Sequence, residues 1–257
     1  MKVRSVVAVL AAATVALAGC SSSKADKTTS PGSVKGTITV FAASSLTEAF
    51  TALATTFEAA HPGTTVKFNF GASSALALQI TQGAPADVFA SASTKNLQQV
   101  IDAGGAKTST NFVKNVMEIA VPPNNPGHVT ALADLAKSGV KVALCEPQVP
   151  CGTTAQKVFD NAKLTVKPVT LEPDVKSTLS KVELGEADAG VVYVTDVRSA
   201  GSKVTGIEIP SDVNASTSYP IAALTEAANA TTAQAFVDFI LSDQARSVLI
   251  ADGFLAP

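Results

Sequence analysis

Tryptophan is absent from the 257-residue chain, and tyrosine and histidine occur only twice each. Charged residues are also scarce, at 16%, and the 19 basic side chains are balanced by 21 acidic ones. Because the chain has neither a basic excess nor aromatic stacking platforms, we do not expect it to bind nucleic acid. The hydrophobic fraction of 46% instead predicts a globular protein, long enough for one large domain or two lobes.

The N-terminus has the pattern of an export signal. A positively charged start, MKVR, precedes an apolar run that is too short and too rich in alanine for a membrane span. The run ends in LAGC, at residues 17–20, which resembles the lipobox of bacterial lipoproteins, in which the cysteine is lipidated. We therefore expect a signal peptide at 1–19 and a flexible tether at 20–35, anchored by Cys20 on the extracytoplasmic side of the cell membrane. The alternative is a plain secretory cleavage with an incidental cysteine.

Two cysteines remain once Cys20 is set aside. Cys145 and Cys151 lie six positions apart, and an even pair in an exported protein favours a disulfide. Closing so short a loop stabilises by about 2 kcal/mol in the chain-entropy model, so its main effect is local rigidity. A metal site would need more ligands, because no CxxC occurs and His61 and His128 stand in turn-like settings, where we expect them at the surface.

From residue 37 the chain alternates short β-branched or aromatic runs with helical periods, as is typical of an α/β sheet with crossover helices. The predicted strands are at 37–42, 65–70, 86–91, 113–121, 140–145 and 189–194. Helical periods occur at 46–57, 73–82, 96–104, 131–137, 153–162, 175–185 and 233–254. The double proline at 122–123 suggests a crossing between two lobes, and the amphipathic C-terminal segment could return to pack on the first.

Several predicted helices begin with small or hydroxyl residues directly after a strand, where open α/β sheets bind their ligands. Ser45 to Glu48 fits a capping box, and Ser73 starts the next helix in the same way. The segments 149–153 and 172–175 precede two further helices. Helix N-termini carry free N–H groups and a partial positive charge, so several that converge on a cleft would bind an anion without a basic side chain. Each serine taken alone is accounted for as an N-cap.

A serine hydrolase is a competing interpretation, since GASSA at 71–75 approaches the G-x-S-x-G nucleophile elbow. Ala75 replaces the second glycine, and no histidine follows His128, whereas an α/β-hydrolase needs one late in the chain. The hydrolase interpretation requires activity on a chromogenic ester. We expect no enzymatic activity.

Four motifs carry a resemblance to a known family. They are TITVFAASSLTEAF at 37–50, GAPADVFASA at 83–92, EPQVPCGTTA at 146–155 and DAGVVYVTD at 188–196. In these motifs and their spacing, the chain resembles the molybdate-binding proteins of bacterial ABC importers, which are class II periplasmic binding proteins. The resemblance implies an α/β, two-lobed type II fold, in which each lobe is a mixed sheet flanked by helices and the ligand cleft lies between the lobes. We expect lobe 1 at 36–120 and 220–257, and lobe 2 at 121–219.

Matched residue by residue, the resemblance implies an oxyanion-binding site. The family's ligand groups fall on the hydroxyls of Ser45, Ser73 and Tyr193 and on the backbone N–H groups of Cys151 and Val175. Ser44, where alanine is common in the family, adds a hydroxyl that could reach the ligand or cap the helix. Cys151 itself departs from the small, alanine-like residue often found there, but a backbone donor does not depend on its side chain. Molybdenum would be held only as molybdate, without protein–metal bonds and without a cofactor.

Other ligands of binding proteins fit the composition less well. Ferric carriers need clustered tyrosines and acids, and only Tyr193 and Tyr219 are present. Carboxylate ligands are usually clamped by arginine, and beyond the signal peptide only Arg198 and Arg246 occur. We therefore expect molybdate or tungstate, with sulfate or another tetrahedral oxyanion as the alternative. The expected partners are an ABC permease with its ATPase and, through Cys20, the membrane, and we expect the protein to act as a monomer.

Overall fold

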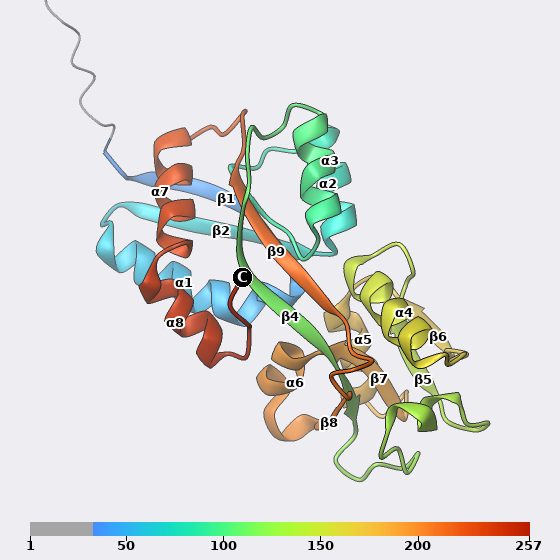
Figure 1. Ribbon diagram of the computed structural model, residues 1–257. Helices are drawn as coiled ribbons and strands as arrows, with labels where there is room; N and C mark the ends of the chain where they lie inside the picture. Colours follow the sequence, from blue (N-terminus) through green and yellow to red (C-terminus); the bar gives the residue numbers. More distant parts are fainter. Residues whose placement is uncertain (1–32) are drawn as a thin grey trace, which may run out of the picture. The chain divides into compact units, whose positions relative to one another are not determined.

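The computed structural model describes residues 33–257 and has the α/β organisation expected from the sequence (Figure 1). The predictions for the signal peptide and for Cys20 lie outside the described residues. The strands are β1 (Gly36–Ala43), β2 (Thr64–Gly71), β3 (Val88–Ala90), β4 (Thr110–Val121), β5 (Val142–Cys145), β6 (Thr170–Glu172), β7 (Ala189–Tyr193), β8 (Thr205–Glu208) and β9 (Ser216–Ala223). The α-helices are α1 (Thr47–Ala60), α2 (Ser73–Thr81), α3 (Thr94–Asp102), α4 (Pro150–Ala162), α5 (Val175–Glu183), α6 (Val194–Ala200), α7 (Ala230–Ile240) and α8 (Asp243–Ala251). Short 3-10 helices are η1 (Ser44–Leu46), η2 (Leu132–Ala136) and η3 (Gly201–Lys203).

The strands form one mixed sheet with the order β2-β1-β3-β9-β4-β7-β5-β6, and β8 pairs with β4. Strands β1, β2 and β3 are parallel to one another, and so are β5, β6 and β7. Strands β4 and β9 run antiparallel to each other and to their remaining neighbours. Each set of parallel strands therefore has its own carboxyl edge, from which the chain enters the helices and where such sheets bind ligands.

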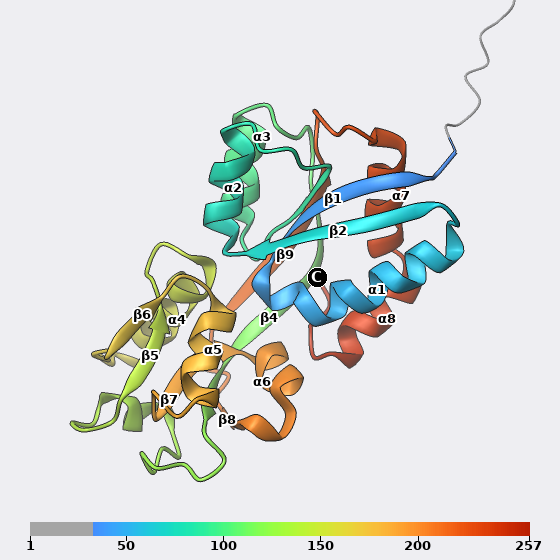
Figure 2. The same ribbon diagram turned by 180° about the vertical axis from the view of Figure 1, so that it is seen from behind.

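The elements pack around two main hydrophobic cores, which form two lobes joined by β4 and β9 (Figures 1 and 2). Strand β4 contributes Val113 to the core that contains β1 and α1, and Met117 to the core that contains β5 and β7. The chain therefore crosses between the lobes within β4. The sequence pattern suggests a crossing at the double proline, residues 122–123, which comes later in the chain. The prolines mark the end of the strand instead, since proline cannot donate to a strand ladder.

The helical period of α1 becomes its buried face. Phe50, Leu53 and Phe57 are at most 1% exposed, and burying each such side chain stabilises by about 1.5–3 kcal/mol. The Phe57 ring meets that of Phe236 on α7 edge to face, with centroids 5.2 Å apart. The C-terminal segment therefore does return to the first lobe.

Several elements differ from the sequence-based prediction, which has no element corresponding to β6, α6 or β8. The segment 233–254 is two helices, because the Ser242 side chain accepts a hydrogen bond from Ala245 N–H (3.3 Å) and starts α8. The segment 131–137 is only the short η2. Strand β9, which the sequence pattern misses, carries Pro220 and several hydroxyl residues but lies in the middle of the sheet.

Among residues 33–257, no helix is long and apolar enough to cross a membrane.

Candidate ligand-binding site

The five residues that the resemblance implies, together with Ser44, line one small pocket between the lobes. Ser44, Ser45, Ser73, Cys151, Val175 and Tyr193 share it with Ala43, Gly71, Ala72, Ala92, Pro150 and Asp174. Its cavity volume, about 10 Å³, is far below the roughly 300–1,000 Å³ of sites for drug-sized ligands. Among residues 33–257, no lysine, arginine or histidine lines it. The pocket is therefore small, and the polar residues that line it are neutral apart from Asp174.

Ser44 and Ser45 follow the carboxyl end of β1 and form η1. Both side chains are largely buried, at 8% and 4% exposure. The Ser45 hydroxyl lies 2.8 Å from the hydroxyl of Tyr219 on β9. Helix α1 begins only at Thr47 and has no side-chain cap, so the prediction that Ser45 caps it is wrong. The partner of the Ser45 hydroxyl is therefore Tyr219, which is distant in sequence, and not a backbone N–H of the following helix.

Ser73 is the first residue of α2, one position after the N-cap residue Ala72. Its hydroxyl accepts a hydrogen bond from Ala92 N–H (2.9 Å), so the prediction that Ser73 caps this helix is also wrong. Ser73 is 1% exposed, and neither His61 nor His128 lines its pocket. Ser73 therefore lines the pocket without either histidine, the usual base of a serine nucleophile, beside it.

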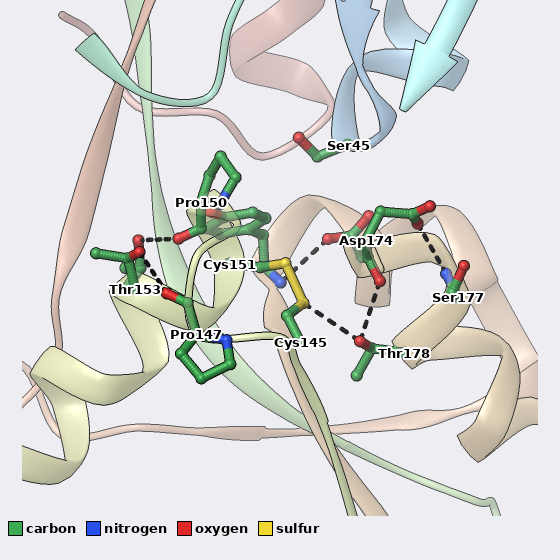
Figure 3. The surroundings of a disulfide bond; sticks show 12 residues. Ser45, Cys145, Pro147, Pro150, Cys151, Thr153, Asp174, Ser177 and Thr178 are labelled. Carbon is green, nitrogen blue, oxygen red and sulfur yellow. Dashed lines mark hydrogen bonds between the residues drawn. A yellow bond between two sulfur atoms is a disulfide. The ribbon is translucent and has the colours of Figure 1, made fainter. Parts of the chain in front are cut away.

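Cys145 ends β5 and Cys151 lies in the first turn of α4, and the structure joins them in a disulfide with the two Cα atoms 5.8 Å apart (Figure 3). The expected pairing is confirmed. The Cys145 sulfur also lies 3.2 Å from the hydroxyl of Thr178 on α5. The first N–H groups of a helix have no acceptor within it, so the disulfide fixes a helix end with free donors at the pocket.

Val175 is the first residue of α5, whose N-terminus is the second helix end at the pocket. The helix is capped by Asp174, whose side chain accepts from Ser177 N–H (2.9 Å). The resemblance does not mark Asp174 as a site residue, although the residue lines the pocket. Figure 3 shows its carboxylate turned toward Ser177, away from Ser45. Its position between a strand and a helix is the feature of the sequence that could have indicated that Asp174 lies at the pocket.

Tyr193 ends β7 and is 1% exposed. Within residues 33–257 its hydroxyl has no hydrogen-bond partner, although it borders the pocket. Burial raises the pKa of Tyr193 far above its ordinary value, and nearby Asp196 adds to that effect. The hydroxyl is therefore protonated at neutral pH, and its proton has no acceptor among the described residues.

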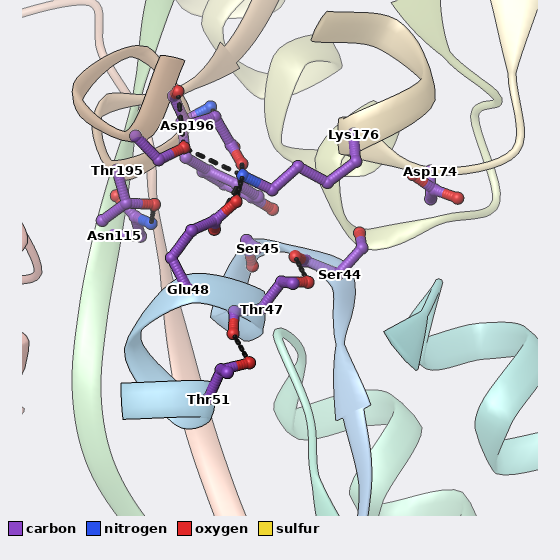
Figure 4. Close-up of polar contacts among 12 residues, drawn as sticks. Ser44, Ser45, Thr47, Glu48, Thr51, Asn115, Asp174, Lys176, Thr195 and Asp196 are labelled. Carbon is purple, nitrogen blue, oxygen red and sulfur yellow. Dashed lines mark hydrogen bonds and ion pairs between the residues drawn. The ribbon is translucent and has the colours of Figure 1, made fainter. Parts of the chain in front are cut away.

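A network of charges beside the pocket links the lobes (Figure 4). The Lys176 ammonium lies 2.9 Å from a Glu48 oxygen on α1 and 3.3 Å from an oxygen of the fully buried Asp196 on α6. Desolvation lowers the Lys176 pKa, but attraction to Asp196 and Glu48 outweighs it and raises the pKa overall. Asp196 also accepts from Tyr193 N–H (3.1 Å). The network thus connects the chain segments that carry Ser45, Val175 and Tyr193.

Neither histidine lines the pocket, and of the two expected at the surface His128 is exposed whereas His61 is partly buried. His128 is exposed and has a φ of 49° in the turn after β4, and His61 is partly covered by the Phe57 ring. The described part of the chain contains no group of three or more His, Cys, Asp or Glu side chains that could hold a metal ion.

Loss of the disulfide should weaken the site more than the fold. Cys145→Ser leaves Cys151 in place but releases the first turn of α4, so we expect a several-fold loss of ligand affinity and a folded protein. Calorimetric titration and urea unfolding measure the two effects. In the wild type, thiol labelling of the unfolded, unreduced chain lacking residues 1–20 should find no free thiol. Two labelled thiols per chain would contradict the pairing.

The buried Asp196 predicts a pH dependence of stability. Burial raises its pKa to about 6, although the Lys176 ammonium counteracts this. The unfolded carboxyl titrates near 3.9, so between about pH 4 and 6 the folded state binds more protons, and the free energy of unfolding falls as the pH rises. Urea unfolding at about pH 4.5 and 7.5 should therefore show wild type losing stability relative to Asp196→Asn. The same pH dependence in both proteins would contradict the assignment.

The two-lobed α/β fold and the donor-lined pocket between its lobes define a substrate-binding protein. The chain belongs to the bacterial extracellular solute-binding proteins, whose family model matches residues 38–255. It is 40% identical over 238 residues to the "Molybdate-binding protein ModA" of Mycobacterium tuberculosis (strain ATCC 25618 / H37Rv), covering 92% of this chain and 91% of that protein. It is 33% identical over 246 residues to the "Putative ABC transporter substrate-binding lipoprotein YvgL" of Bacillus subtilis (strain 168), covering 93% of each chain.

Among solved structures, the "substrate binding domain of putative molybdenum ABC transporter from Clostridium difficile" matches with a TM-score of 0.65 and 28% identity. The match covers 86% of this chain and 99% of that one. The fold class and the family predicted from the sequence are thereby confirmed.

Proposed function

We propose that this protein captures molybdate or tungstate outside the cytoplasmic membrane and delivers it to an ABC permease. The observation that carries the proposal is the pocket itself, where three hydroxyls and two helix N-termini from both lobes meet around a small space that no basic side chain lines. The relatives named for molybdate binding support the choice of ligand.

The donors explain how a dianion can be held by neutral groups. Hydrogen bonds to a charged group contribute about 1.5–3 kcal/mol each. Five donors, from Ser45, Ser73, Tyr193, Cys151 and Val175, offset the desolvation of the anion and the cost of closing the lobes. The balance supports micromolar to nanomolar affinity, or about −8 to −12 kcal/mol. The partial positive charge of the α4 and α5 N-termini adds to it.

Binding is a non-covalent capture in which the lobes close over the ion by hinge motion. The bend falls where the chain crosses between the cores, near 113–117 in β4 and 216–219 in β9. The closed form then docks on the permease, whose ATPase drives uptake. The protein acts as a monomer, held to the membrane by a lipid on Cys20, and the relative named as a lipoprotein supports this anchor.

The protonation state of each oxyanion determines whether the pocket can bind it. Hydrogen phosphate carries a proton near neutral pH, and each pocket group assigned to the ligand donates. Among the described residues that line the pocket, the only carboxylate is that of Asp174, which is turned toward Ser177 and accepts from its N–H (2.9 Å). A buried P–OH without an acceptor costs about 1–3 kcal/mol, so phosphate should be rejected. Sulfate has no such proton and can be refused only because its shorter bonds leave donors out of reach.

Calorimetric titration of the purified domain with four oxyanions tests the proposal. Molybdate and tungstate should bind comparably, sulfate much more weakly and phosphate not measurably. Sulfate binding as tight as molybdate would make sulfate capture the function instead. Tight phosphate binding would mean that the Asp174 carboxylate accepts a hydrogen bond from the P–OH group of the ligand.

A further inference from the structure

Both pocket serines are already hydrogen-bonded inside the protein. A serine hydroxyl has one proton to donate and two lone pairs to accept with. For Ser73 the direction is fixed, because Ala92 N–H can only donate to it (2.9 Å). The Ser73 proton is thus left for another acceptor. For Ser45 the partner is the Tyr219 hydroxyl at 2.8 Å, and either oxygen of this pair can donate.

The surroundings of Tyr219 favour one direction. Its side chain is 0% exposed, and it does not line the pocket. Burial raises the pKa of Tyr219 well above its ordinary value, so the phenol keeps its proton. That buried proton needs an acceptor, and leaving it unmet costs about as much as a hydrogen bond to a charged group gains. The Asn115 side chain also lies near the Tyr219 hydroxyl; its oxygen accepts from Val116 N–H (3.0 Å) and its nitrogen donates to the Thr195 hydroxyl (2.8 Å).

The opposite direction would work against anion binding. If Ser45 donated to Tyr219, only its lone pairs would face an anion oxygen, which is repulsive. If Tyr219 donates, the Ser45 proton is left for another acceptor, and Ser45 lines the pocket.

We propose that Tyr219 is a positioning residue for anion capture: it donates to Ser45 Oγ and so directs the Ser45 proton toward the ligand. The inference rests on the proposed function. Tyr219 acts without touching the ion, in the same way that Ala92 N–H acts on Ser73. Both serines are thereby held as obligate donors before the ligand arrives, which lowers the ordering cost of binding.

A double-mutant cycle tests this role by titration with sodium molybdate. Tyr219→Phe removes only the hydroxyl and keeps the ring, which packs edge to face against Phe112 and Phe254. We expect about a tenfold rise in the molybdate Kd in the wild-type background, and less than about a twofold rise when Ser45→Ala is already present. Thr232→Val, which removes a buried hydroxyl on α7, is the control and should leave the Kd unchanged.

The outcomes separate the positioning role from the function. An unchanged Kd in Tyr219→Phe, or an equal loss with and without the Ser45 hydroxyl, overturns the role of Tyr219 while molybdate binding by the wild type stands. A wild type that binds no molybdate overturns the proposed function itself. Melting temperatures of the unliganded variants show whether any loss of affinity reflects a loss of fold.

Discussion

Gly152→Ala should be among the most damaging single substitutions in this protein. A Cβ at this position would overlap the carbonyl oxygen of Glu146 and would lie 2.7 Å from its carbonyl carbon and 2.9 Å from the Cys145 carbonyl oxygen. These are backbone atoms, and they cannot move away easily. The disulfide to Cys151 fixes one side of the loop, and Glu146 N–H is bonded to the Glu172 carbonyl (2.8 Å).

We expect the free energy of unfolding to fall by more than about 3 kcal/mol, because the clash must distort either α4 or the end of β5. The same distortion moves the Cys151 N–H, so molybdate affinity should fall with it. Urea unfolding measures the first effect and titration the second. Gly71→Ala is the matched control for stability, since its Cβ would make only ordinary contacts with Leu76, at 3.7 Å and beyond. Equal stability of the two variants would show that the α4 loop is not held as described.

Removing either pocket serine hydroxyl should have the largest effect on binding. Ser45→Ala and Ser73→Ala each delete a hydrogen bond to a charged ligand, which corresponds to a loss of about 10- to 150-fold in affinity. Ser73→Ala also leaves Ala92 N–H buried without its partner, so stability should fall by about 1–3 kcal/mol. Ser74→Ala is the control, because Ser74 neighbours Ser73 but does not line the pocket. Titration and urea unfolding separate the two effects.

If Ser45→Ala and Ser73→Ala change only the melting temperature of the unliganded protein, the assignment of these serines as ligand-binding residues is wrong. That pattern would mean that they support the fold through Tyr219 and Ala92 alone. A loss of affinity without a loss of stability in Ser45→Ala would place its contribution in the ligand contact.

The spacing of apolar residues in the sequence predicted those helices and strands whose buried side chains follow a regular period. The period of Phe50, Leu53 and Phe57 predicted α1, and its three side chains are buried. Strand β9 was not predicted because Pro220 argues against a central strand. In the fold, β9 nevertheless pairs with β3 on one side and β4 on the other. The break at Ser242 was missed because the apolar period of α7 and α8 continues past it.

The same distinction applies to the site. Hydroxyl residues at helix starts are a local signal for caps, but the partners of Ser45 and Ser73 are Tyr219 and Ala92, distant in sequence. Long-range partners of this kind cannot be derived from spacing. What the motifs did predict is the set of segments that meet, because every one of them follows the carboxyl end of a parallel strand or, for Tyr193, ends one.

The most direct test of the central claim is the position of the molybdenum atom in crystals of the protein grown with molybdate. Anomalous diffraction at the molybdenum absorption edge locates that atom independently of the oxygen ligands. We expect one peak in the pocket, with oxygens in hydrogen-bonding reach of the Ser45, Ser73 and Tyr193 hydroxyls and of the Cys151 and Val175 N–H groups. A peak elsewhere on the molecule, or no peak from crystals grown at saturating molybdate, would contradict it.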